Sequence, residues 1–225
     1  YHKIDDTVEA TIIQPLAALL QSGGYELKPV LHALLSSDHF YENASRACYI
    51  KNPADFVIGT LTEFNVPLPA LSDHSTGYPF FYKVYWEMAK MQLDLFQPPD
   101  VSGWPSYYQE PMFYELWVNS NSLPKRAVFT DNLLEEGVLD LRAFVSQTSN
   151  PADPVKLVED ISSLLLQYPL STTSQDYLRN RYLLNNSNNN SVWTTAWNSN
   201  NTTTINQNLK DLFQCLLNLP EYHLC

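Results

Sequence analysis

Three carboxylates lie in one proline-rich stretch, QPPDVSGWPSYYQEPMFYELW at residues 97–117. Asp100, Glu110 and Glu115 are the residues of this stretch that could act as an acid and a base. Most glycosidases use two carboxyl groups that lie about 5 to 10 Å apart across a cleft. These three residues are therefore candidate catalytic residues of a glycosidase-like hydrolase, although nothing in their spacing requires such a pair.

Other familiar catalytic patterns are missing from the sequence. Asp73, His74 and Ser75 follow one another in LSDHST, but neighbours in sequence seldom converge into a triad, and there is no G-x-S-x-G motif. The five histidines show neither H-x-x-x-H nor H-E-x-x-H spacing. We therefore predict no metal site and no cofactor.

The proline-rich stretch also contains aromatic residues that could bind a ligand. The candidate ligand-binding residues in and after it are Trp104, Tyr107, Tyr108, Trp117, Asn119 and Arg126. Exposed rings stack on the apolar faces of sugars, and an amide such as Asn119 would supply hydrogen bonds. The alternative is structural: Trp104 and Trp117 are buried and anchor the loop, and Arg126 stacks on a ring or donates to loop carbonyls.

The spacing of apolar residues is helical along most of the chain. Residues 7–20 place five apolar residues on one face, with Thr7 as the expected N-cap and Gly23-Gly24 as the end: Val8, Ile12, Leu16, Leu19 and Leu20. Residues 80–95 repeat the pattern with Phe81, Val84, Met88, Met91 and Leu95. No alternating run is long enough for a sheet, so we predict an all-α fold, an irregular multi-helix bundle.

Helix starts are marked by capping residues followed by proline. Asn52 precedes Pro53, and Asp153 precedes Pro154, which places a side-chain acceptor at the N-cap and proline at the first helical position. Ser122 is the expected cap of a helix that follows the proline-rich stretch. Gly103, directly before Trp104, indicates a positive φ or a close backbone approach.

We interpret residues 1–225 as a single helical domain with two long loops. The first covers 97–122 and is rich in proline and aromatic residues. The second covers 185–208, where ten Asn and eight Ser or Thr in 24 positions predict a solvated loop. Trp193 and Trp197, four residues apart, are expected to hold one helical turn of it against the core.

Composition excludes several classes of partner. The formal charge is −11, from 24 acidic and 13 basic residues, and Lys and Arg form no cluster, which argues against nucleic acid. No stretch approaches the roughly 20 apolar residues that cross a bilayer, so we expect no membrane insertion. The three cysteines, Cys48, Cys215 and Cys225, are too far apart for a zinc ribbon. A Cys48–Cys215 disulfide stays open as an alternative.

Several motifs, in this order, resemble one bacterial family, known as domain of unknown function 1800. They match its C-terminal half and are HALLSSDHFYE, IKNPADFVIGTL, LFQPPDVSGWP, WVNSNSLPKRAVF, VWTTAW and LLNLPEYHLC. The segment Pro-Pro-x-x-x-Gly-Trp-Pro is the most specific of them. No activity is established for the family.

The resemblance implies an exported protein, periplasmic or extracellular, whose N-terminal half precedes this chain and packs against it. From the aromatic residues of the proline-rich stretch we expect a binding or scaffolding module, with a polysaccharide or a partner protein as its ligand. The alternative is the hydrolase that uses the carboxylates near the proline-rich stretch.

Overall fold

A computed structural model describes residues 4–43, 46–98, 101, 103 and 114–225 of the chain. Its helices are α1 (Asp6–Val8), η1 (Glu9–Ile13), α2 (Gln14–Ser22), α3 (Leu27–Leu35), η2 (Asp38–Tyr41), α4 (Pro53–Glu63), α5 (His74–Lys90), η4 (Tyr114–Trp117), α6 (Ser122–Glu135), α7 (Leu141–Val145), α8 (Pro154–Leu165), α9 (Thr172–Leu178), η5 (Arg179–Leu183), α10 (Ser191–Asn198), α11 (Thr202–Leu217) and η6 (Pro220–His223). The described residues form no strand, and Ile50 and Leu224 form an isolated antiparallel bridge. The predicted all-α class is confirmed.

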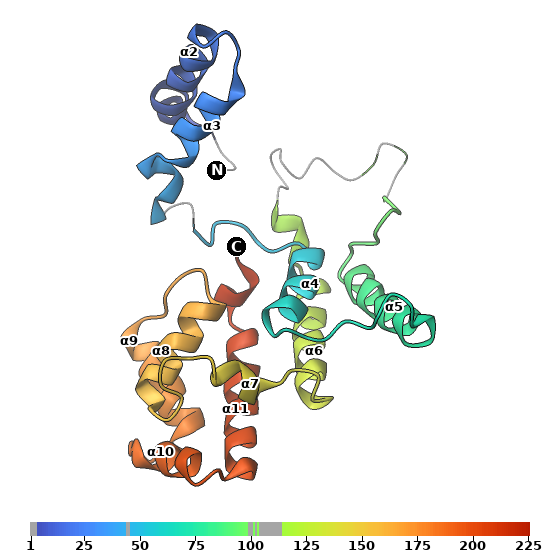
Figure 1. Cartoon of the computed structure of the whole chain (residues 1–225), viewed down its shortest axis with the longest axis vertical. Coiled ribbons are helices and arrows are strands. Elements are labelled where there is room, and N and C mark those ends of the chain that lie inside the picture. Colours follow the sequence, from blue (N-terminus) through green and yellow to red (C-terminus); the bar gives the residue numbers. More distant parts are fainter. Residues whose placement is uncertain (1–3, 44–45, 99–100, 102, 104–113) are drawn as a thin grey trace.

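Helix α11 is the centre of the bundle. It packs against α6, α7, α10 and η5, while α8 packs against α9 and η5 (Figure 1). Apolar residues three and four positions apart make one face of α11 continuous, and this face is buried: Ile205, Leu209, Leu212, Phe213, Leu216 and Leu217. Burial of such a face supplies most of the stability of a helix in a globular protein.

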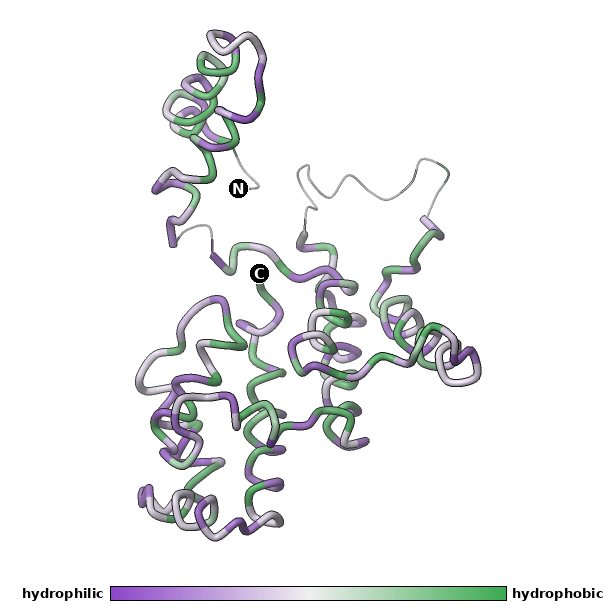
Figure 2. Tube along the Cα trace, in the orientation of Figure 1, coloured by the Kyte–Doolittle hydropathy of each residue, from purple (hydrophilic) through white to green (hydrophobic). Residues whose placement is uncertain are grey.

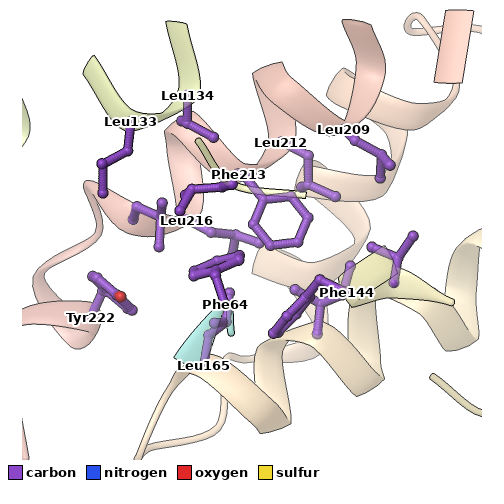
Figure 3. Close-up of a cluster of buried hydrophobic side chains, with 14 of the residues drawn as sticks. Phe64, Leu133, Leu134, Phe144, Leu165, Leu209, Leu212, Phe213, Leu216 and Tyr222 are labelled. Atoms are coloured by element: carbon purple, nitrogen blue, oxygen red, sulfur yellow. The ribbon is translucent and has the colours of Figure 1, made fainter. Parts of the chain in front are cut away.

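Aromatic rings from three helices meet at the middle of this core (Figure 3). Phe64, directly after α4, lies 4.7 Å from Phe144 of α7 and 5.6 Å from Phe213 of α11, measured between ring centroids. Phe144 and Phe213 meet edge to face at 5.6 Å, one of the arrangements that aromatic pairs prefer. The rings therefore join α4 to the C-terminal part of the bundle.

Two predicted helix starts are confirmed. The Oδ1 atom of Asn52 accepts hydrogen bonds from the backbone N–H groups of Ala54 and Asp55, at 2.8 and 2.9 Å, and Pro53 is the first residue of α4. Asp153 accepts from the N–H of Val155 at 2.9 Å, and Pro154 opens α8. In both helices a side chain satisfies an N–H group that the helix itself leaves without a partner.

Two other predicted caps were wrong. The N-cap of the first helix is Asp5, two residues before the expected Thr7, and Asp5 accepts from the N–H of Val8. Ser122 is the first residue of α6 rather than its cap. Asn119 takes the capping role, since its Oδ1 accepts from the N–H groups of Asn121 and Ser122, at 2.9 Å each.

The asparagine-rich segment is more helical than we expected. Residues 191–198 form α10, and α11 begins at Thr202, so little of the range 185–208 is loop. The Trp193 side chain is completely buried, its Nε1 donates to the carbonyl of Pro151 at 2.8 Å, and its ring lies 5.6 Å from that of Trp197. Tertiary burial of these rings therefore overrides the polar composition of the segment.

The N-terminal helices form a hairpin that projects from the bundle (Figure 1). The apolar face predicted for residues 7–20 is only half-buried, and no residue of α1, η1, α2 or α3 is fully buried. Green apolar and purple polar residues both occur along this hairpin in Figure 2. No helix in the described part of the chain is long and apolar enough to cross a membrane. The thiols of Cys48, Cys215 and Cys225 form no disulfide.

Candidate functional site

Most of the candidate residues in the proline-rich stretch lie outside the described residues. They are Asp100, Trp104, Tyr107, Tyr108 and Glu110. Gly103 is described, and its φ of 105° confirms the positive φ expected there. Glu115, in η4, is exposed, and its carboxylate forms no hydrogen bond or ion pair with the described residues.

Trp117 and Asn119 hold the chain as it enters α6. The Trp117 side chain is 6% exposed, so it offers no free ring face to a ligand. Its carbonyl accepts from Ser122 Oγ at 3.0 Å. Asn119 donates through Nδ2 to Gln92 at 2.7 Å, in addition to accepting the two N–H groups at the start of α6. Both residues therefore have structural contacts of the kind expected for the anchoring alternative.

Arg126 is the most deeply buried charge of the described residues, with an exposed fraction of 0%. Its Nη2 donates to the carbonyls of Lys51 at 2.6 Å and of Trp117 at 3.4 Å, and its guanidinium lies 4.8 Å from the centre of the Phe56 ring. The expected ring and carbonyl contacts are thus both present. Among the described residues, its Nε and Nη1 have no partner, and burial lowers its pKa to about 10.

His223 is stacked on the same phenylalanine. The ring centroids of Phe56 and His223 are 5.1 Å apart, with an angle of 26° between the planes. Burial lowers the pKa of His223 to about 4, and the nearby charges of Arg126 and Lys51 act in the same direction. At neutral pH this histidine is therefore an uncharged ring beside a buried cation.

An aromatic surface lies on α5, which precedes the proline-rich stretch in the sequence. Tyr78, Tyr82 and Trp86 follow one another at four-residue intervals and are 72%, 63% and 48% exposed. The rings of Tyr82 and Trp86 are nearly parallel, 10° apart with centroids at 6.1 Å, and His74 stacks on Tyr78 at 5.6 Å. We call Tyr78, Tyr82 and Trp86 the α5 aromatic row.

The row lies on the outer side of a helix whose inner side is held by the core. Met88 and Met91 are buried and Val84 is partly buried, as the sequence predicted for this face, whereas Phe81 is exposed. Tyr85, beside the row, donates from its hydroxyl to Asp94 at 2.5 Å, which ties α5 to the chain that follows it. The rings are therefore displayed from a packed helix.

Sequence reasoning missed this row because it followed only the face of residues 80–95 that carries Phe81, Val84 and the two methionines, and made no assignment of Tyr78, Tyr82 or Trp86. The missed signal was the repeat of an aromatic residue every four positions in YPFFYKVYW, residues 78–86. Four-residue spacing places side chains on one side of a helix, and the methionines already occupied another side. Two separate faces of α5 were thus readable from the sequence.

Comparison with known proteins identifies the family. A family model described as protein of unknown function (DUF1800) matches residues 2–224. Neither a curated protein nor a solved structure matches the chain. Because the family model covers nearly the whole chain, this protein belongs to the DUF1800 family of proteins of unknown function.

Proposed function

We propose that this protein is a binding module for a polysaccharide and that the α5 aromatic row is its contact surface. The observation that carries the proposal is the exposure of three large rings in one row, two of them nearly parallel. Exposed large apolar side chains grouped on one surface commonly mark an interaction site. The proposal includes the periplasmic or extracellular location implied by the family resemblance.

The geometry of the row fits a sugar chain. Tyr78 and Trp86 are eight residues apart, which corresponds to about 12 Å along a helix axis. A ring face packs well on the C–H face of a pyranose, and tyrosine also offers a hydroxyl for hydrogen bonds. A row of such rings along a rigid helix can contact successive sugar units without ordering a flexible loop.

The hydrolase alternative has no comparable support in the described residues. Glu115, the described member of its three carboxylates, is exposed and contacts no other described charged group. A partner protein remains the other ligand class for a binding module, and the experiment below separates it from a polysaccharide.

Affinity electrophoresis of the full chain in gels with a neutral polysaccharide tests the proposal. Suitable probes are hydroxyethylcellulose, mixed-linkage β-glucan, xylan and dextran, each compared with a gel without polysaccharide. We expect at least one probe to retard the wild type, and Trp86→Ala and Tyr82→Ala each to weaken binding about tenfold, which corresponds to about 1.4 kcal/mol.

Tyr177→Ala is the matched control. Tyr177 lies on α9 and is 61% exposed, close to the 63% of Tyr82, so its loss removes a similar ring from another surface. We expect its binding to equal that of the wild type. Retardation of the Tyr82→Ala/Trp86→Ala double variant equal to wild type, or no retardation by any probe, would refute polysaccharide binding and leave a partner protein as the ligand.

A further inference from the structure

The outer surface of α4 forms a hollow of about 520 Å³ that the aromatic row does not touch. Lys51, Asp55, Gly59 and Glu63 line it, together with Ile58 and Thr62. Lys51 precedes the helix, and Asp55, Gly59 and Glu63 follow at four-residue spacing, so one side of α4 forms the floor. The hollow thus combines one cation, two carboxylates and one glycine, at which the helix has no side chain.

Lys51 and Glu63 share this hollow but are not paired with each other. The ammonium of Lys51 lies 4.4 Å from the centre of the Tyr222 ring and forms no hydrogen bond or ion pair with the described residues. The hydroxyl of Tyr222 donates to Glu63 Oε2 at 3.1 Å and lies 2.9 Å from Thr60 Oγ1. Tyr222 therefore contacts both charged groups, the Lys51 ammonium over its ring and the Glu63 carboxylate at its hydroxyl.

Burial makes it costly for Lys51 and Glu63 to carry their charges in the hollow. It lowers the pKa of Lys51, against the attraction of Glu63, and it raises the pKa of Glu63, against the attraction of Lys51. A ligand that supplied an opposite charge to each group would reverse both effects. Partly buried charged groups with shifted pKa values in a hollow are typical of binding sites.

Gly59 is the second, independent indication of a ligand. It lies in the interior of α4, where glycine destabilises a helix relative to alanine. A Cβ atom added there would have no heavy atom within 4 Å, so packing inside the protein does not require glycine. Glycine at this position leaves the helix backbone open to close approach from the hollow.

We propose that this hollow binds a short zwitterion, such as a dipeptide, with its carboxylate at Lys51 and its ammonium at Glu63. The ligand backbone lies over Gly59, where a side chain would obstruct it. This site is independent of polysaccharide binding by α5.

The charged residues that line the hollow favour a ligand with one positive and one negative group. A ligand with only a carboxylate would pair with Lys51 but bring negative charge towards Asp55 and Glu63. A ligand with only an ammonium would pair with the carboxylates but be repelled by Lys51. Like charges at close range disfavour binding, so each singly charged analogue binds more weakly than the zwitterion.

Isothermal titration calorimetry of the full chain with three matched probes tests the site. The probes are Ala-Ala, N-acetyl-Ala-Ala, which lacks the ammonium, and Ala-Ala amide, which lacks the carboxylate. We expect Ala-Ala to bind at least tenfold more tightly than either analogue. No detectable binding of Ala-Ala, or equal binding of all three probes, overturns the proposal.

Variants assign the binding to this hollow. Lys51→Met and Glu63→Gln should each weaken Ala-Ala binding at least tenfold, whereas Lys156→Met, which removes a surface lysine of α8, should leave it unchanged. Gly59→Ala should raise the melting temperature and still weaken binding, so unfolding cannot explain that loss. Ala-Ala binding by Gly59→Ala or Lys51→Met that equals the wild type overturns the proposal.

Discussion

Acidification should destabilise this protein through one buried histidine, His223. Burial, Arg126 and Lys51 together lower its pKa from 6.5 to about 4. The unfolded chain therefore takes up this proton near pH 6.5, whereas the folded protein takes it up only near pH 4. The stability contribution of neutral His223 is fully present above pH 6.5 and decreases as the pH falls through this range.

The size of the effect follows from the shift. One pKa unit corresponds to about 1.4 kcal/mol, so lowering the pH from about 7.5 to about 4.5 should remove about 2.5 kcal/mol of the free energy of unfolding. His223→Gln cannot take up a proton. The difference in free energy of unfolding between the wild type and this variant should therefore change by this amount across the range.

Urea unfolding followed by circular dichroism at several pH values measures this difference. Other groups titrate in the wild type and in the variant alike, so their contributions largely cancel in the comparison. An offset between the two proteins at pH 7.5 would reflect the lost stacking of His223 on Phe56 and does not bear on the histidine pKa, which is tested by the change of that offset with pH. Curves that stay parallel from pH 7.5 to 4.5 would refute a depressed histidine pKa.

Two further predictions concern the helices. Trp193→Ala should lower the free energy of unfolding by about 3 to 5 kcal/mol, because the ring is completely buried and the carbonyl of Pro151 would lose its hydrogen bond. Trp197→Ala should lower it less, because Trp197 is only half-buried. Equal losses for the two variants in urea unfolding would argue against the anchoring role of Trp193. Asn52→Ala should cost about 1 kcal/mol through loss of the cap of α4, and Asn52→Ser, which keeps an acceptor without placing a second carboxylate beside Asp55, should cost clearly less; equal thermal midpoints for the two variants would contradict capping as the cause.

Local signals predicted the parts of the structure that depend on neighbouring residues. Asn52-Pro53 and Asp153-Pro154 marked the starts of α4 and α8, because an N-cap acts on N–H groups two or three residues away. Gly103 marked a positive φ, a property of the single residue. The sequence also predicted that Arg126 contacts a ring or donates to backbone carbonyls. It did not predict that Phe56 and Lys51 are the partners.

The candidate sites depended on more distant contacts. The sequence contains the four-residue repeat of the aromatic row, but packing decided its exposure, since it buries Met88 on the inner side of α5 and leaves Tyr82 and Trp86 outside. The Glu63 carboxylate in the hollow on α4 accepts a hydrogen bond from Tyr222, which lies more than 150 residues along the chain from it. No spacing rule connects residues so far apart.

The sequence by itself determined the helical class, several helix starts and the family, because each of these is encoded in short patterns. Which helix faces become buried was decided only by the tertiary structure. Residues 27–40 and 209–222 carry similar leucine patterns, yet the second places its apolar face in the core as part of α11, whereas no residue of α3 is fully buried. The physical reason is that a local pattern creates an apolar face, but only contacts between distant segments remove that face from water.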